Sequence, residues 1–291
     1  MSLVFLSDLV RTWQFNIIAL LVITVVFVQY YKLSVVGAKQ DGAVLVVLQC
    51  IGGMSILVLM PFYPITFATD PGTYLLLLAA VVLYALNDRI QTTVRRHLDV
   101  SLFSILNQFS KVFLVLYGIF LFHQQIVSRR LVGGVLILLS IAALFYRRGK
   151  IHLNRHVLLS LLAELVIATA ITIDVDISTQ FNLPAYIMIT LVLPALLVFS
   201  VERLKVAEIV EEFQSDRKAY HLVTGVSWGL LILFTIRSLQ LGEAVFIAPL
   251  MAVSVPLNVV VASILHHEKD HMLRKIIVSF VIILGIYLTV V

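Results

Sequence analysis

Residues 244–291 read AVFIAPLMAVSVPLNVVVASIL, then HHEKDHMLRK, then IIVSFVIILGIYLTVV. Two apolar runs therefore flank one polar connector, residues 266–275. A helix needs about 20 residues to cross the roughly 30 Å hydrocarbon core of a bilayer, and each run approaches or exceeds that length. The stretch predicts a hairpin of two membrane-spanning helices.

Residues 101–146 hold a weaker copy of this hairpin, with the runs SLFSILNQFSKVFLVLYGIFLF and LVGGVLILLSIAALFY around HQQIVSRR. Residues 101–125 align with 244–268 without a gap, and one inserted residue then brings Arg130 over Arg274. One copy of the hairpin in each half of the chain indicates a duplicated integral membrane protein.

The composition excludes a soluble protein. The chain is 61% hydrophobic and 13% charged, with a mean hydropathy of +1.06, whereas about a quarter of the residues of soluble proteins are charged. The apolar runs lack the alternation of a membrane strand, so helices are the structure that can satisfy their backbones within lipid. The single cysteine, Cys50, lies in an apolar run, and we expect no disulfide, no metal and no cofactor.

We predict an all-α integral membrane protein of ten helices in two inverted five-helix repeats. The first repeat is 1–146, a basic linker is 147–155, and the second repeat is 156–291. Because five is odd, two homologous halves must have opposite orientations in the membrane, as in secondary transporters whose substrate site lies near the midplane. The expected segments are 16–36, 42–63, 73–94, 101–123, 127–146, 156–175, 183–201, 222–241, 244–265 and 274–291.

The basic residues predict the orientation. Of the 21 lysines and arginines, fifteen lie in the connectors after the odd-numbered segments or at the segment ends beside them, three at the N-terminus or beside the other connectors, and three deeper within segments. Positive connectors stay in the cytoplasm, which places the 147–155 linker and the 202–221 loop there and both termini outside. We expect the bacterial cytoplasmic (inner) membrane, with a short amphipathic helix in 202–221 at its surface.

The C-terminal hairpin resembles the EamA-like transporters of the drug/metabolite transporter superfamily. The resemblance rests on a proline-containing segment, a connector with Glu268, and Arg274 opening a last segment that contains Gly285. The first-half copy keeps Arg129, Arg130, Gly133 and Gly134 but has Gln124 and Gln125 in place of His267 and Glu268. The resemblance implies a carrier that moves a small metabolite by alternating access, and it implies no particular substrate.

Lys111 lies near the centre of the fourth segment, with Asn107 and Ser104 on the same helix face. A charge at bilayer depth is costly and usually faces a partner or a watery cavity. We predict that these three residues bind substrate, the alternative being a structural bond between two helices. Glu164, in the middle of the sixth segment, is the expected partner of Lys111. That pair could be broken by an anionic substrate or by protonation, or it could be static.

The third segment ends in ALNDRIQTTVRR, residues 85–96. Asn87, Asp88, Arg89 and Gln91 predict a gate or cavity mouth, against the alternative of a helix end emerging into the headgroups. Asp88 shares a face with Gln91, whereas Arg89 points elsewhere.

Other polar and proline residues receive structural interpretations. Pro249 and Pro256 predict a kinked ninth helix. Asp174 and Asp176 are interpreted as a solvated helix end, and Arg237 as scaffold or a lipid anchor. A metal site at the histidines of the 266–275 connector is set aside, as are enzymatic activity, any catalytic residue and nucleic-acid binding.

The expected function is secondary transport of a small polar metabolite, anionic or zwitterionic, with a proton or another ion as a candidate coupling species. The lipid bilayer is the other partner, and the protein is expected as a monomer or homodimer. Two alternatives remain open. One is a non-transporting accessory or receptor subunit, and the other is a flippase for a lipid-linked sugar.

Overall fold

The computed structural model describes residues 12–110, 112–113, 116–117, 128–147, 150–151, 154–241, 250–268 and 270–290. This part of the chain is helical apart from one hairpin of two-residue strands, Tyr146–Arg147 (β1) and Lys150–Ile151 (β2), within the predicted linker region. The α-helices are α2 (Trp13–Val35), α3 (Asp41–Leu57), α4 (Pro71–His97), α5 (Val100–Leu106), α7 (Ser128–Phe145), α8 (Arg155–Ile177), α9 (Leu183–Val201), α10 (Val206–Phe213), α11 (Lys218–Leu241), α13 (Ser254–Leu265) and α14 (Met272–Val290). Three short 3-10 helices are η1 (Met60–Phe62), η2 (Asn107–Phe109) and η3 (Ser178–Gln180).

Within the described residues, six helices are long and apolar enough to cross a membrane: α2, α4, α8 over Arg155–Asp174, α9, α11 over Lys218–Ser238, and α14 over Met272–Thr289. Three shorter apolar helices cover Asp41–Leu57, Val100–Phe109 and Leu250–Leu265. The chain is thus an all-α protein with several helices of membrane-spanning length and composition, and the amphipathic helix expected in the 202–221 loop is present as α10.

Polar caps fix where several of these helices begin. The side chains of Thr12, Asp70, Asn154 and Asn182 each accept a hydrogen bond from the backbone N–H three residues later, at the starts of α2, α4, α8 and α9. Such a cap satisfies one of the amide hydrogens that the first turn of a helix leaves unpaired.

Three predicted segments differ from the helices observed. In the second, the α-helix ends at Leu57, and Pro61 instead lies in η1. In the fourth, α5 ends at Leu106 and tightens into η2. In the ninth, a turn at Val253 separates a helical stretch over 250–252 from α13, which then has Pro256 in its first turn. Proline clashes with the carbonyl four residues earlier, so a helix running through Ala252 stops there. Pro249 lies outside the described residues.

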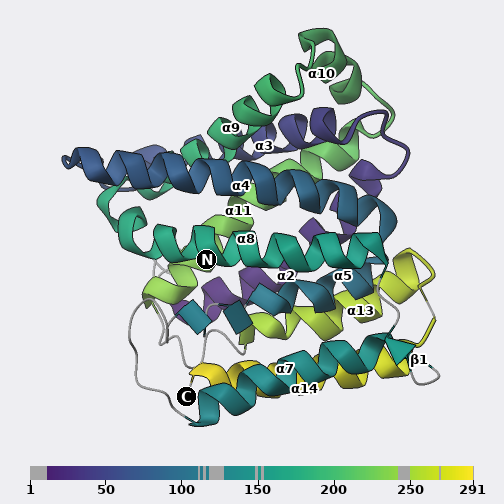
Figure 1. Cartoon of the computed structure of the whole chain (residues 1–291). Coiled ribbons are helices and arrows are strands. Elements are labelled where there is room, and N and C mark those ends of the chain that lie inside the picture. Colours follow the sequence, from purple (N-terminus) through teal and green to yellow (C-terminus); the bar gives the residue numbers. More distant parts are fainter. Residues whose placement is uncertain are drawn as a thin grey trace, which may run out of the picture.

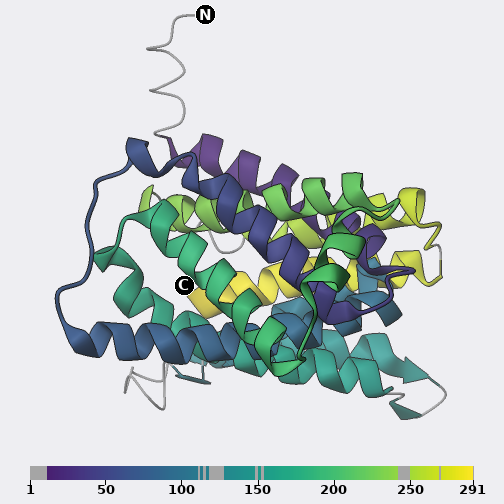
Figure 2. The same cartoon turned by 90° about the horizontal axis from the view of Figure 1, so that it is seen from above.

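The closest packing occurs between helices from different halves of the chain. α2 packs against α11, α3 against both α9 and α11, α4 against α8, α5 against α13 and α7 against α14. Figure 1 shows α4 beside α8, with α7 and α14 paired at one edge of the bundle, and Figure 2 shows α3 and α9 side by side and oblique to the rest. Helices within one half contact each other much less.

These pairs are antiparallel. In α4–α8, Tyr84 in the middle of α4 bonds Asp174 near the C-terminus of α8, and the rings of His97 and His156, at the C-terminus of α4 and the N-terminus of α8, stack 4.1 Å apart. In α7–α14, Gly133 lies against Gly285, while Arg274 donates to a carbonyl near the other end of α7. Antiparallel neighbours are what alternating spans from oppositely oriented halves would give.

The described parts of the connectors after the odd-numbered segments gather at one end, which we call the basic end: residues 36–40, 97–99, 146–147, 150–151, 154, 202–217, 266–268 and 270–271. Gln40 donates to Glu208 at 3.1 Å, and the amide of Val100 donates to Glu268 at 2.7 Å. With the stacked histidines, these contacts tie α2, α4, α8, α10 and α13 together there. In Figure 1, α10 and β1 both lie at this end, on the right.

At the opposite end, Asn182 joins two connectors. Its side-chain amide donates to the carbonyls of Tyr63 (3.2 Å) and Pro64 (2.9 Å), and its backbone N–H donates to Thr66 (2.7 Å). The two ends of the bundle are therefore held by different connectors, odd-numbered at one and even-numbered at the other.

The outer surface of the bundle is apolar. Large exposed side chains include Ile18, Leu75, Leu139, Ile264 and Phe280, on five different helices. Contiguous apolar surface on this scale would be a liability in water and suits contact with lipid chains.

Candidate functional site at the interface of α4 and α8

One face of α4 is polar and buried. Asn87, Asp88, Gln91, Thr92 and Arg95 are each less than 10% exposed. Their spacing of three or four residues puts them on neighbouring positions of one side of the helix. This side faces the interior of the bundle, and the apolar side faces outward.

Asp88 is held by amides. Gln49 of α3 donates to one carboxylate oxygen at 2.7 Å, and Asn87 donates to the other at 2.8 Å. Among the described residues, no lysine, arginine or histidine nitrogen lies within 4.0 Å of this carboxylate. Burying a carboxyl group with amide partners alone is costly, which marks Asp88 as a candidate functional residue.

Glu164 of α8 is fully buried and connects to this group. The Gln91 amide donates to Asn87 at 3.2 Å and to Glu164 at 3.4 Å. In the amide orientation that satisfies both groups, the Asn107 nitrogen donates to the two oxygens of Glu164 at 2.7 and 3.2 Å. Residues from α3, α4, η2 and α8 thus form one polar network between the halves.

The network lies near mid-depth. Gln49, Asp88 and Glu164 are eight or nine residues from the basic-end termini of their helices. At 1.5 Å per residue this is about 12 to 14 Å, close to half of a roughly 30 Å hydrocarbon core.

Arg95 lies one to two turns nearer the basic end. Its guanidinium carbon is 5.2 Å from the ring centre of Phe27, 4.5 Å from that of Tyr31 and 3.9 Å from that of Phe103. Gln91 accepts a long hydrogen bond from it at 3.4 Å, and the Nε atom is buried without an acceptor.

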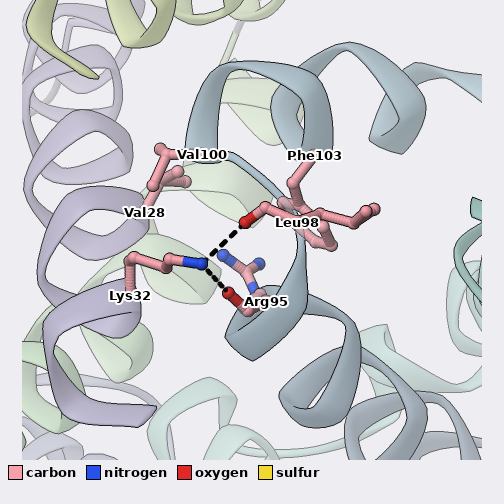
Figure 3. Close-up of a pocket in the computed structure, with 6 residues that line it drawn as sticks. All are labelled: Val28, Lys32, Arg95, Leu98, Val100 and Phe103. Atoms are coloured by element: carbon pink, nitrogen blue, oxygen red, sulfur yellow. Dashed lines mark hydrogen bonds between the residues drawn. The ribbon is translucent and has the colours of Figure 1, made fainter. Parts of the chain in front are cut away.

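A small, partly open pocket adjoins Arg95, as Figure 3 shows, and its side chains leave no room for a water molecule between them in this conformation. Lys32 lines it but is already engaged, because its amine donates to the carbonyls of Arg95, Arg96 and Leu98 at 2.8, 3.0 and 2.8 Å. Lys32 therefore caps the C-terminus of α4, and Arg95 is the cation with donors left for a ligand. The remaining lining residues are Val28, Leu98, Val100 and Phe103.

The predicted substrate-binding residues have different environments in the structure. Asn107 and Glu164 are brought together by the fold. Ser104 is buried, but its hydroxyl donates to the carbonyl of Val100 on its own helix. Lys111 lies outside the described residues, so its predicted pairing with Glu164 stays a prediction.

The predicted gate divides into two parts. Asn87, Asp88 and Gln91 are buried in the interior, and their role at a gate or cavity mouth stays a prediction. Arg89 points the other way, toward the rim of the basic end, where it pairs with Glu202. Adjacent helical residues point about 100° apart, so a single role for all four was geometrically unfavourable.

Asp174 departs from its predicted solvated position. It accepts hydrogen bonds from the hydroxyls of Tyr84 and Tyr186, at the end of α8 opposite the basic end. Tyr84 is four residues before Asp88, so the polar face of α4 continues toward that end. Arg237 lies over the ring of Tyr63, with 5.8 Å to its centre.

Glu268, which contributes to the sequence resemblance, has a structural contact. Its carboxylate accepts from the amides of Val100 (2.7 Å) and Ser101 (3.0 Å) and from the Ser101 hydroxyl (2.5 Å). It thereby caps the first turn of α5, where a negative charge is favourable. Lys275 donates to the same hydroxyl at 2.7 Å.

A further buried acid lies at the basic end, outside the apolar helices. Glu212 of α10 accepts from Arg217 at 2.8 Å and pairs with His221 at 3.0 Å. Burial alone would raise the pKa of this carboxyl, but the two hydrogen bonds outweigh it and lower the pKa below its usual value.

Sequence reasoning missed Gln49 and the binding features of Arg95. Gln49 is a single polar residue in an apolar run, and that isolation is a usable signal for a buried partner. Arg95 neighbours Arg96 at a helix end, a pattern that by itself indicates only topology. Its three aromatic neighbours come from α2 and α5, which no local pattern reveals.

Comparison with protein-family models finds none that matches this chain, and comparison with curated proteins finds no match either. The function is therefore argued from the site. The arrangement can hold a polar solute or a proton between the halves, since it combines two buried carboxyl groups, four amides and an arginine in a bundle of apolar helices.

Proposed function

We propose that this protein is a secondary transporter that moves a small polar metabolite across a membrane by alternating access. In this proposal ten helices span the bilayer as two inverted five-helix repeats, and the basic end faces the cytoplasm. Asp88, Glu164 and Asn107 form the solute or coupling-ion site, with Lys111 contributing to it. Membership of the EamA-like group of transporters is part of the proposal and rests on the two hairpins.

The buried network around Asp88 and Glu164 is the observation that carries the proposal. Polar groups in the middle of an apolar bundle reduce its stability. In membrane proteins, groups that are placed there despite this cost commonly line a substrate or ion pathway. The network also lies between the two halves, where carriers built from repeats bind their substrates.

The helix packing supports the inverted repeats. The helices of the two halves are matched in order: α2, α3, α4, α5 and α7 with α8, α9, α11, α13 and α14. Exchanging each helix for its match turns the α2–α11 pair into the α8–α4 pair, which is also among the closest pairs. The pairs α3–α9, α5–α13 and α7–α14 each map onto themselves. This pattern is expected when a single rotation axis relates the two halves. Because the paired helices are antiparallel, that axis must run perpendicular to them.

A non-transporting membrane subunit is the second candidate, and one contact favours it. Asn107 engages its amide with Glu164, as a static link between η2 and α8 would require. Under this alternative, the polar face of the fourth segment never meets water.

Thiol labelling combined with transport tests the proposal. Cys50 is replaced by Ala, cysteine is introduced at Asn107 or Lys111, and a small charged thiol reagent is applied to each side of proteoliposomes. Transport predicts labelling that a metabolite from a panel blocks, together with counterflow of that metabolite. Folded protein that is labelled from neither side and shows no counterflow would favour the non-transporting subunit.

A further inference from the structure

Arg95 is a buried cation with unused hydrogen-bond donors. It is 6% exposed, and a guanidinium carries five N–H groups. Within the part of the chain that the structure describes, its guanidinium makes one hydrogen bond, the long one to Gln91, and Nε has no acceptor. Among the described residues, no carboxylate oxygen lies within 4.0 Å of its nitrogens.

The aromatic rings around Arg95 compensate for part of its lost hydration. Cation–π contacts with Phe27, Tyr31 and Phe103 stabilise the charge. These ring faces do not replace acceptors in the plane of the guanidinium. The contacts therefore hold the side chain in place and leave its edge available, which suits a ligand that accepts two parallel hydrogen bonds.

The pocket beside Arg95 limits the size of that ligand. Pockets for whole small molecules measure about 300 to 1,000 Å³, whereas this one spans about 160 Å³ including space open to solvent, and its walls must part to admit any ligand. It suits one charged group rather than an entire metabolite. Its lining residue Leu98 belongs to the basic end and Val100 begins α5 directly beyond it, so the group would arrive from that side.

We infer that Arg95 binds an oxyanion group, a carboxylate or a phosphate, of the molecule that this protein carries. This inference rests on the proposed function and names its substrate class as an organic or inorganic oxyanion. Gln91 bonds both Arg95 and Glu164, so an oxyanion that takes the Arg95 donors competes with the Gln91 link. Binding at the basic end is thereby coupled to the mid-depth network.

Trp228 provides a reporter for this binding. Its ring centre lies 5.4 Å from both Phe27 and Tyr31, two of the rings around Arg95. The chain has two tryptophans, and Trp13→Phe leaves Trp228 alone. In the full-length Trp13→Phe protein in nanodiscs of phosphatidylcholine, we expect succinate and inorganic phosphate to change the Trp228 emission saturably. Succinamide and sodium chloride of equal ionic strength should not.

Substitutions at Arg95 sharpen the test. Arg95→Lys keeps the charge and the packing but loses the paired donors, and we expect the apparent Kd to rise about tenfold, which corresponds to one charged hydrogen bond. Arg95→Gln should abolish the saturable change. Arg155→Gln removes an exposed arginine at the same end and should leave the Kd unaltered. All variants are compared as monodisperse protein by size exclusion.

The outcomes separate this inference from the proposed function. No saturable change with either oxyanion, or equal Kd values for Arg95→Lys and its parent, overturns the oxyanion site even if a neutral metabolite shows counterflow. Oxyanion binding without counterflow of any metabolite would support the oxyanion site at Arg95 and contradict the proposed transport function. Nanodiscs that contain phosphatidylglycerol distinguish the source: if this lipid saturates the signal and soluble oxyanions cannot compete, the oxyanion is a lipid headgroup and flipping becomes the form of transport.

Discussion

The helix pairs α4–α8 and α7–α14 both join the two halves of the chain, yet they are built in opposite ways. Between α7 and α14 the backbones nearly touch at Gly133 and Gly285. Between α4 and α8 the interface contains amides and carboxyl groups, including the fully buried Glu164. The first pair maximises packing, as small residues do in membrane bundles. The second is equally extensive but places polar groups in its interface, and the proposed transport function rests on these groups.

The largest expected effect is at the close-packed pair. A Cβ at position 133 would collide with the Gly285 carbonyl oxygen and lie 2.8 Å from the Thr289 nitrogen, both backbone atoms. Gly133→Ala should therefore destabilise the protein by about 2 to 3 kcal/mol, the usual cost of overpacking, measured as a lower Tm in detergent. A Cβ at position 134 would meet nothing within 4 Å, so Gly134→Ala is the matched control and should be neutral or slightly stabilising. Equal Tm values for the two variants would refute the close contact.

The polar pair should respond in activity and not in stability. Glu164→Gln keeps the shape and removes the charge, and we expect counterflow to fall about tenfold or more, equivalent to about 1.4 kcal/mol or more, with little change in Tm. Glu211→Gln, at the exposed surface of the basic end, is the control. A large fall in Tm with no separate loss of transport would instead make Glu164 a structural residue.

A smaller effect is expected at Glu268, which caps α5 from the other half of the chain. Glu268→Gln keeps one acceptor and loses the charge beside the helix terminus, so the expected destabilisation is about 1 kcal/mol. Asp270→Asn, exposed in the same connector, should have no effect. Thermal unfolding in detergent compares the two variants, and identical unfolding curves for both would contradict the capping role of Glu268.

The smallest effect is a pH dependence at the basic end. Hydrogen bonds from His221 and Arg217 lower the pKa of Glu212 despite its burial, so the unfolded chain binds a proton here before the folded chain does. The resulting stabilisation is present above about pH 4.5 and is lost as the pH falls through the lower, folded-state pKa. Limited proteolysis of residues 202–217 should accelerate at acidic pH, and Glu212→Gln should flatten that dependence. A parent protein whose cleavage rate ignores pH in this range would contradict the assignment.

Helix positions were predictable because apolar length and caps are local. α4, α8 and α9 begin within a few residues of their predicted starts, at the capping residues Asp70, Asn154 and Asn182. The gathering of basic connectors at one end also follows from counting lysines and arginines. What composition alone could not supply is the break at Val253, which depends on how Pro256 is accommodated.

The candidate site was predictable only in part. Asn107 and Glu164 stood out because each is polar at membrane depth, and they do meet. The roles of Gln49 and Arg95 depend on contacts between α4 and three other helices, which a single sequence does not encode in any local pattern. The direction of Asp174, toward two tyrosines rather than solvent, is a tertiary outcome of the same kind.

The interleaving of the two halves has a consequence for biosynthesis. Val100 and Ser101 leave the ribosome 168 and 167 residues before the glutamate that caps them. α2, α3 and α4 likewise find their main neighbours in α11, α9 and α8, all made later. The helices of the first half thus lack most of their final contacts until α8, α9 and α11 have been made, and the cap on α5 is completed only by the C-terminal hairpin. A chain truncated after its midpoint should therefore be a substrate for membrane quality control rather than a stable half-protein.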